Sequence, residues 1–196
     1  MQRGADTLII LAALPLWLPL LAVALAVAVL DGHRSLLFRQ QRMGRGCRPF
    51  TIYKIRTMRA GLAPPPGALF EGWTYAGDPR VTRAGAFLRR YRLDELPQLW
   101  NVMRGEMSLV GPRPEPVEIA MRLGAELPGY DARHAVLPGL TGLCQISPVY
   151  RDFGTLEKSA RKLEYDLAYV RDRSMRLNGR ILLRTVVVLL RGEGVA

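Results

Sequence analysis

Two adjacent acidic residues and a rigidly held arginine lie close together in the segment from Arg92 to Pro114. Asp94 and Glu95 open an amphipathic stretch, and we expect Asp94 to cap a helix whose first turn holds Pro97. Arg113 lies between two prolines that fix the backbone, so its guanidinium starts from a rigid base. An arginine held in this way suits a bidentate phosphate contact. The segment therefore indicates chemistry on a phosphate.

The two acids admit a structural interpretation and a catalytic one. Asp94 and Glu95 can simply cap the helix and complement its dipole, which is a common role for such residues. Three arginines within two helical turns favour a phosphate site instead: Arg89, Arg90 and Arg92. Carboxylates on a metal and guanidinium groups on phosphate oxygens together can hold a magnesium-bound diphosphate. In such a site, a carboxylate removed from water can itself attack phosphorus.

Further candidate ligands lie outside this segment. Histidine catalysis and zinc sites have little support, because the only two histidines are His33 and His134. Lys54, Arg56 and Thr57 end a predicted strand and are candidate phosphate ligands. Asp166 is expected on the polar side of a helix, where a solvated acid is the ordinary interpretation. The two cysteines, at positions 47 and 144, form neither a disulfide framework nor a metal-binding spacing.

Composition and charge indicate one domain of ordinary size with a membrane anchor. The chain has 196 residues, 49% of them hydrophobic, and a formal net charge of +11. A basic surface favours anionic partners, and an apolar anchor beside it favours acidic membrane lipids over nucleic acid. We therefore expect membrane lipids, and no nucleic acid, among its partners. The expected division is an anchor at residues 1–31 and a catalytic domain at 32–196.

The run from Leu8 to Leu30 carries no charge and is long enough to cross a hydrocarbon core. Pro15 and Pro19 lie inside it and should bend the helix. Basic residues flank both ends, so the positive-inside rule gives no direction. The residues fit a kinked spanning helix and a re-entrant hairpin equally well.

The remaining pattern predicts an α+β fold that is mostly helical. Strands at Leu36–Gln41 and Phe50–Arg56 should form a hairpin, followed by a loop at Ala60–Thr74 and a short helix ending at Arg92. The helix after Asp94 should bury four apolar residues: Leu96, Leu99, Trp100 and Met103. The segment 137–142 is predicted to form a rigid turn, and a long helix is predicted to begin near Thr155. A final amphipathic helix at 178–191 fits either a membrane interface or an ordinary core.

Six motifs in order along the chain resemble the bacterial sugar transferases, the monotopic phosphoglycosyl transferases that begin glycoconjugate assembly. The length is similar to their short form, which consists of the catalytic module. The motifs begin at Tyr53, Asp78, Leu93, Gly111, Pro138 and Glu164, and read YKIRTM, DPRVTR, LDELPQL, GPRP, PGLTG and EYD.

The resemblance implies transfer of a sugar-1-phosphate from a UDP-sugar to polyprenyl phosphate, with release of UMP, at the bacterial inner membrane and on its cytoplasmic face. It implies that Asp94 attacks the β-phosphorus and binds Mg²⁺, and that Glu95 assists. It also implies a proline-broken re-entrant helix, with Pro19 as the main break, and interfacial amphipathic helices. The implied substrate-binding residues are Lys54, Arg56, Thr57, Arg80, Arg89, Pro112, Arg113, Arg151 and Asp166.

The sequence departs from the family pattern at three places. Leu18 replaces a serine before the breaking proline, and Leu137 replaces an arginine. The basic residue that the family places soon after Gln145 is assigned to Arg151, across an insertion. These departures concern the anchor and the sugar pocket.

Two other classes of function share some of these features. A CDP-alcohol phosphotransferase would need several spanning helices and a motif of multiple aspartates, and the sequence has neither. A basic membrane-anchored adaptor, or a nucleic-acid-binding module, would explain the charge and the anchor. Neither of these would explain the pair of acids at Asp94 and Glu95.

Overall fold

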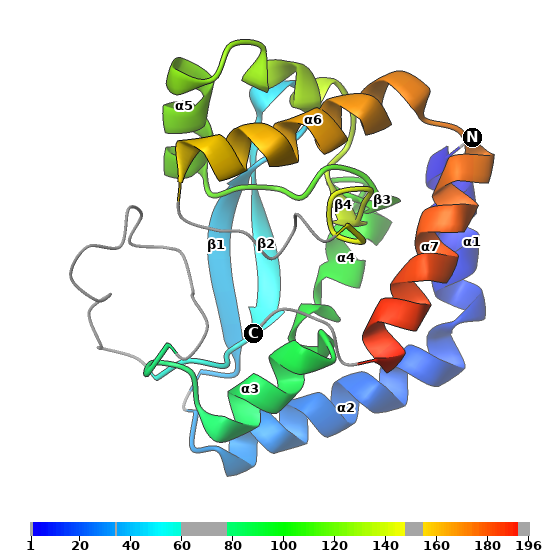
Figure 1. Ribbon diagram of the computed structural model, residues 1–196. Coiled ribbons are helices and arrows are strands. Elements are labelled where there is room, and N and C mark those ends of the chain that lie inside the picture. The colour runs from blue at the N-terminus through cyan, green and yellow to red at the C-terminus, as the bar shows by residue number, and fades with distance from the viewer. Residues whose placement is uncertain (1, 34, 60–77, 148–154, 192–196) are drawn as a thin grey trace.

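The computed structural model describes residues 2–33, 35–59, 78–147 and 155–191. It is a mostly helical α+β structure with two small sheets of two strands each (Figure 1). This agrees with the predicted fold class. The predicted loop at Ala60–Thr74 and the candidate ligand Arg151 lie outside the described residues.

The first sheet is the predicted hairpin of β1 (Leu37–Met43) and β2 (Pro49–Ile55). The strands are antiparallel and in register from Leu37 opposite Ile55 to Met43 opposite Pro49. A 3-10 turn, η1 (Arg45–Cys47), forms the tip of the hairpin. The first strand extends two residues beyond its predicted end at Gln41, which brings Arg42 and Met43 into the ladder.

The N-terminal apolar segment forms two helices, α1 (Gln2–Ala12) and α2 (Leu14–Leu30), bent by 69°. The prediction that Pro19 makes the main break is wrong, because Pro19 lies inside α2. The break falls at Ala13 instead. Pro15 lies in the first turn of α2, where its missing N–H costs nothing, whereas in a continuous helix its ring would clash with the preceding turn.

The bend is stabilised by a side chain from its second arm. The indole Nε1 of Trp17 donates a hydrogen bond of 3.0 Å to the carbonyl of Ile10. The first arm is anchored at its other end, where Ser108 Oγ donates to Asp6 Oδ2 at 2.6 Å. Gln2 also donates to Ser108 and to the carbonyl of Val110, so α1 docks on the strand Ser108–Val110.

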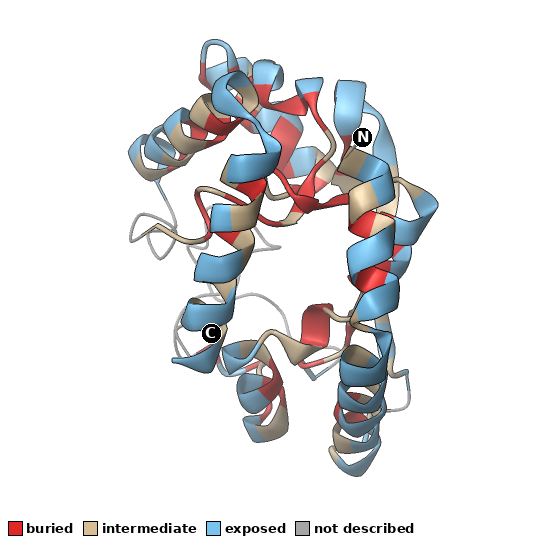
Figure 2. Ribbon diagram, turned by 90° about the vertical axis from the view of Figure 1, so that its right-hand side faces the viewer, coloured by how far each residue is buried: buried red, intermediate tan, exposed pale blue. Residues whose placement is uncertain are grey.

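Among the described residues, no single helix is long and apolar enough to cross a membrane. The bent pair α1–α2 meets that test together, by length and composition only. Many of its large apolar side chains are exposed, Leu16 and Leu30 among them. Figure 2 shows the buried residues concentrated in the upper part of the molecule, with largely exposed elements below.

The segment that carries the two acids consists of three short elements: α3 (Arg83–Arg90), the 3-10 turn η2 (Leu93–Glu95) and α4 (Gln98–Arg104). The prediction that Asp94 caps a helix is wrong, since Asp94 lies inside η2 and α4 begins only after Pro97. The predicted burial pattern of this helix is also partly wrong. Leu99 is buried, but Trp100 and Met103 are exposed.

The second sheet pairs β3 (Ser108–Val110) with β4 (Gly139–Thr141) in parallel. The segment predicted as a rigid turn at 137–142 therefore contains a strand. Its glycine has a steric reason, because a Cβ at Gly139 would collide with the backbone of Gly111. The close approach is held by two backbone hydrogen bonds of 2.8 Å, from the Gly111 amide to the carbonyl of Thr141 and from the Gly139 amide to the carbonyl of Pro112.

Helix α5 (Val117–Glu126) and the 3-10 segment η3 (Tyr130–Ala135) precede the long predicted helix α6 (Leu156–Asp172), which runs across the top of Figure 1. Thr155 caps α6 by accepting a hydrogen bond from the backbone of Lys158. Asp166 was expected on the polar face of this helix, but it is buried. Helix α7 (Met175–Leu190) closes the described chain.

A small apolar cluster joins α2 to the acid-bearing segment. Ala24 and Ala28 of α2 are buried against Ile55, at the end of β2, and Leu88 of α3. Leu93, the first residue of η2, packs against the same cluster. In Figure 1, α2 runs along the bottom of the molecule directly below α3. The turn that holds Asp94 and Glu95 therefore rests on the apolar helix.

Candidate active site

The two acids are presented by a turn whose backbone is constrained on its N-terminal side. Arg92, which precedes η2, has a left-handed backbone with φ 54° and ψ 25°. A left-handed conformation is uncommon for a residue with a side chain, and such residues concentrate at functional sites. Asp94 and Glu95 are each only 6% exposed. The fold thus holds two adjacent carboxyl groups away from bulk water.

Glu95 is the hub of an ion-pair cluster. Its Oε1 lies 2.8 Å from Lys54 Nζ and 2.6 Å from Arg113 Nη2. Its Oε2 lies 3.6 Å from Arg92 Nη1. These partners come from β2, from the loop after β3 and from the residue before η2. Glu95 therefore ties its own turn to β2 and to the loop after β3, two parts of the chain that are remote from it in sequence.

The electrostatics of Glu95 follow from these contacts. Burial alone would raise the pKa of the Glu95 carboxyl, because it penalises the charged form. The surrounding positive charges outweigh burial and hold the pKa well below its ordinary value; they belong to Arg113, Lys54 and Arg92. Glu95 is therefore ionised at neutral pH, and its charge is compensated by the protein.

Asp94 has a different environment from its neighbour. Among the described residues it makes no hydrogen bond or ion pair. Burial raises the pKa of Asp94, with nearby Glu95 adding to the effect. The charges of Lys54 and Arg89 act in the opposite direction. Asp94 is thus a buried carboxyl group with cations around it and no protein partner bound to its oxygens.

The loop that carries Arg113 is fixed through its backbone. The carbonyl of Pro112 accepts a hydrogen bond of 2.8 Å from the Gly139 amide. The carbonyl of Pro114 accepts one of 3.0 Å from Arg42 Nη1. With the carbonyls on both sides of it held, Arg113 presents a guanidinium that is 24% exposed. The Gly-Pro-Arg-Pro motif therefore positions one cation beside the two acids.

A second buried ion pair, between Arg133 and Asp166, supports the loop that carries Arg113. Arg133 Nη2 donates to Asp166 Oδ2 at 2.6 Å and to the carbonyl of Arg113 at 2.7 Å. Its Nε also donates to Asp166 Oδ2, and its Nη1 donates to the Tyr130 hydroxyl. Asp166 therefore acts on the site through Arg133, rather than by facing Glu95 itself.

Thr57 and Arg89 form another contact close to Asp94. Arg89 Nε donates to Thr57 Oγ1 at 2.8 Å. Thr57 is buried, and its carbonyl accepts a hydrogen bond from the Thr82 amide. Gly85 makes this possible, since a Cβ there would collide with the carbonyl of Thr57. The start of α3 and the end of β2 are thereby held together beside Asp94.

The other predicted ligands have defined places outside this cluster. Arg80 makes a two-pronged contact with Asp78, in which Nη2 and Oδ2 lie 2.7 Å apart. Arg56 Nε donates to the carbonyl of Ser35 at 3.0 Å. The structure thus gathers Lys54, Asp94, Glu95 and Arg113 in one cluster, with Arg89 and Thr57 beside it.

Sequence reasoning missed two side chains that organise the site, Arg133 and Arg42. Arg133 contacts Asp166 across 33 positions of the chain, and no local pattern marks it. Arg42 lay beyond the predicted end of its strand. The pattern of alternating residues in β1, read two residues further, would have found Arg42. No sequence pattern of this kind would have identified Arg133.

Comparison with known proteins places this sequence in a family. The sequence model of the bacterial sugar transferases matches residues 1–192. The exopolysaccharide production protein PSS of Rhizobium leguminosarum bv. phaseoli is 40% identical over 200 residues, which cover 99% of this chain and 98% of that protein. Its length is therefore comparable to that of this chain.

Two longer relatives match over part of their length. A UDP-N-acetylgalactosamine-undecaprenyl-phosphate N-acetylgalactosaminephosphotransferase of Aeromonas hydrophila is 37% identical over 98% of this chain and 44% of its own length. A UDP-glucose:undecaprenyl-phosphate glucose-1-phosphate transferase of Caulobacter vibrioides is 42% identical over 89% of this chain and 64% of its own length. With a family match over nearly its whole length, this chain belongs to the bacterial sugar transferases.

Proposed function

We propose that this protein transfers a sugar-1-phosphate from a UDP-sugar to polyprenyl phosphate, specifically undecaprenyl phosphate, and releases UMP. The names of its relatives support the substrate classes, since they specify UDP-sugars and undecaprenyl phosphate. The observation that carries the proposal is the contrast between the two acids. Glu95 is bound by three cations, whereas its neighbour Asp94 is buried among cations with no described partner.

The proposed nucleophile is Asp94. One of its carboxylate oxygens attacks the β-phosphorus of the UDP-sugar, and the bond from that phosphorus to the bridging oxygen breaks. UMP departs with the electron pair of that bond, leaving an acyl phosphate that carries the sugar. An oxygen of the polyprenyl phosphate then attacks the same phosphorus and displaces the Asp94 carboxylate. The products are UMP and a polyprenyl-diphosphate sugar.

The cations around the acids are suited to the charges of this reaction. The backbone around Arg113 is held by hydrogen bonds and its guanidinium is partly exposed, so the guanidinium can contact phosphate oxygens without movement of the backbone. Lys54 and Arg89 flank Asp94 and can offset charge that builds up on the phosphate. Glu95 orients Lys54 and Arg113 through its ion pairs, and so assists without contacting the phosphorus.

Magnesium fits the donor set at Asp94. Mg²⁺ in phosphate-transferring enzymes is commonly held by one or two carboxylates together with substrate phosphates. Asp94 supplies one carboxylate that no described protein group occupies, whereas the oxygens of Glu95 are already bound to cations. Bound there, Mg²⁺ would neutralise charge on the diphosphate. Arg89 and Arg113 would then hold the remaining phosphate oxygens.

The proposed location is the cytoplasmic face of the bacterial inner membrane, with the bent pair α1–α2 entering and leaving by the same face. The 69° bend and the exposed leucines of both helices support a re-entrant segment over residues 1–31. Leu93 packs on the same cluster as Ala24 and Ala28, so the acids would lie at the membrane surface. The exposed apolar residues of α7 would extend the same surface as an interfacial helix. A site at this height can receive both a water-soluble UDP-sugar and a lipid phosphate.

The reaction product identifies the chemistry. Purified protein with Mg²⁺ and a short polyprenyl phosphate would be offered UDP-glucose, UDP-N-acetylgalactosamine and other UDP-sugars. We expect UMP to be released with one or two of them, as the first membrane step of exopolysaccharide or glycoconjugate synthesis. Release of UDP instead would mean that the sugar is transferred without its phosphate, and would refute the proposal.

A second experiment tests the nucleophile separately. Asp94→Asn should abolish turnover and the phosphosugar adduct on the protein, detected by intact mass after rapid quenching with UDP-sugar alone. Glu106→Gln is a matched control, because Glu106 is a carboxylate that pairs with Arg104 outside the cluster. Near-normal turnover by Asp94→Asn would exclude Asp94 as the nucleophile, even if UMP remained the product.

A further inference from the structure

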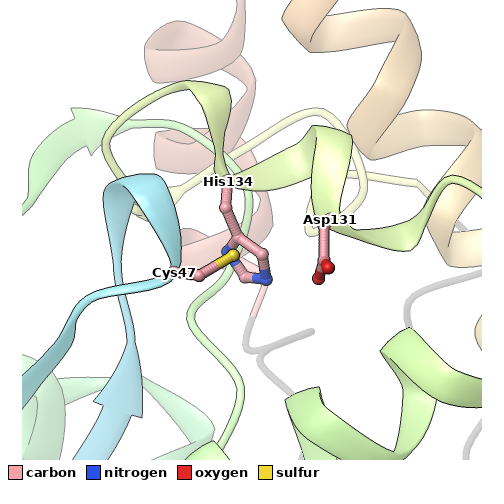
Figure 3. A group of neighbouring side chains, drawn as sticks. All are labelled: Cys47, Asp131 and His134. Carbon is pink, nitrogen blue, oxygen red and sulfur yellow. The ribbon is translucent and has the colours of Figure 1, made fainter.

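A second cluster of potential ligands lies at the tip of the β1–β2 hairpin, apart from the two acids. Cys47 of η1 and Asp131 and His134 of η3 each offer one ligand atom, and these atoms lie within 4.8 Å of one another. Figure 3 shows the three side chains converging on one point from two separate elements. We propose that Cys47, Asp131 and His134 form a binding site for a thiophilic divalent transition metal, of which Zn²⁺ is the representative.

The ligand types favour this class of metal. A thiolate, an imidazole and a carboxylate are all ordinary zinc ligands, and three protein ligands leave a fourth position for water. Mg²⁺ and Ca²⁺ prefer all-oxygen sites, so the sulfur of Cys47 selects against them. This site therefore differs in chemistry from the carboxylate proposed to bind Mg²⁺ at Asp94.

The state of His134 gives an independent indication of a ligand. His134 is only 6% exposed, yet its Nε2 has no hydrogen-bond partner among the described residues. A buried polar atom without a partner is costly, and a metal would satisfy it. Nε2 of the imidazole therefore offers a lone pair that a cation can accept, at a position close to the ligand atoms of Cys47 and Asp131.

The hairpin tip that carries Cys47 has an unusual backbone and is open to solvent. Cys47 has a left-handed backbone with φ 55°, directly after Gly46, which has φ 65°. Cys47 and Asp131 are both exposed, so a metal can reach them from solvent. The spacing of the two cysteines gave no sign of such a site, because its ligands come from segments that are more than eighty residues apart.

The site has a structural connection to the proposed catalytic loop. His134 follows Arg133, whose guanidinium holds the carbonyl of Arg113. His134 and Arg133 also line a small pocket together with Pro112 and Pro114. A metal that ties η1 to η3 would therefore steady the segment on which Arg113 depends.

Cobalt provides the direct test, because a cobalt–thiolate bond gives a charge-transfer absorption that oxygen ligands do not. Purified full-length protein, stripped with a chelator and kept in excess Mg²⁺, would be titrated with Co²⁺. We expect the absorption to saturate at one equivalent and to disappear on addition of Zn²⁺. Cys47→Ser should remove it, and Asp131→Asn should weaken Co²⁺ binding at least tenfold.

Two controls separate this site from the rest of the protein. Cys144→Ala should keep the absorption, because Cys144 is buried elsewhere and is not among the three ligands. Asp94→Asn should also keep it, which distinguishes the site from a metal at the two acids. Absence of the absorption in folded wild-type protein, or its persistence in Cys47→Ser, would overturn the proposal.

Discussion

Replacing Asp166 with leucine removes the carboxylate that two nitrogens of Arg133 contact, at 3.0 and 2.6 Å. The two side chains are 7% and 4% exposed, so the guanidinium would be left charged and buried without its counter-ion. Removing one partner of such a pair typically costs about 3–5 kcal/mol. We expect Asp166→Leu to lower the free energy of unfolding by that amount, and to reduce sugar-phosphate transfer as well.

A second substitution separates stability from activity. Replacing both members of a buried ion pair with apolar residues is often neutral or stabilising. Adding Arg133→Met to Asp166→Leu should therefore recover most of the lost stability. Methionine cannot donate to the carbonyl of Arg113, however, and a hydrogen bond to a charged group contributes about 1.5–3 kcal/mol. Activity of the double variant should stay at least tenfold below wild type.

The measurements are urea unfolding in detergent and turnover under saturating UDP-sugar. Glu157→Leu is the matched control, because Glu157 pairs with Arg161 on the exposed side of the same helix, where the side chains are 74% and 56% exposed. That change should alter stability by less than about 1 kcal/mol. Recovery of both stability and activity in the double variant would show that the contact between Arg133 and Arg113 has no functional role.

Two further predictions concern the bend and the acid cluster. Trp17→Phe removes the hydrogen bond to the carbonyl of Ile10 and should lower stability by about 1 kcal/mol in a thermal melt; the same change at the exposed Trp100 should have no effect. Glu95 has a pKa well below its ordinary value of 4.5, so it contributes stability that is present above pH 4.5 and lost as pH falls through the lower folded-state pKa. Between about pH 5 and about pH 3, unfolding free energy should therefore fall more steeply in wild type than in Glu95→Gln, and equal slopes would contradict the assignment.

Local signals predicted the elements that depend on local sequence. Two short predicted strands joined by a glycine-rich turn indicated the hairpin, and an apolar stripe after Thr155 indicated helix α6. The two acids and Arg113 were identified because short motifs carry them. Asp166 was read as solvated because its environment is set by Arg133, which approaches from another segment. The break was expected at Pro19 because the family resemblance implied it there, whereas it falls at Ala13, next to the first turn of α2 that holds Pro15.

Neighbouring positions in one turn have here acquired opposite electrostatic environments, and this supports the assignment of their roles. Glu95 points into a group of cations that lowers its pKa, and these contacts occupy its oxygens. Asp94 is buried to the same extent, but burial raises its pKa and no described group binds its oxygens. The charges of Lys54 and Arg89 beside Asp94 favour its ionised form, which attack on phosphorus requires. A carboxylate already bound to Lys54 and Arg113 would have to break those contacts before attacking phosphorus, whereas Asp94 would not. The same geometry therefore assigns orientation of the cations to Glu95 and attack to Asp94.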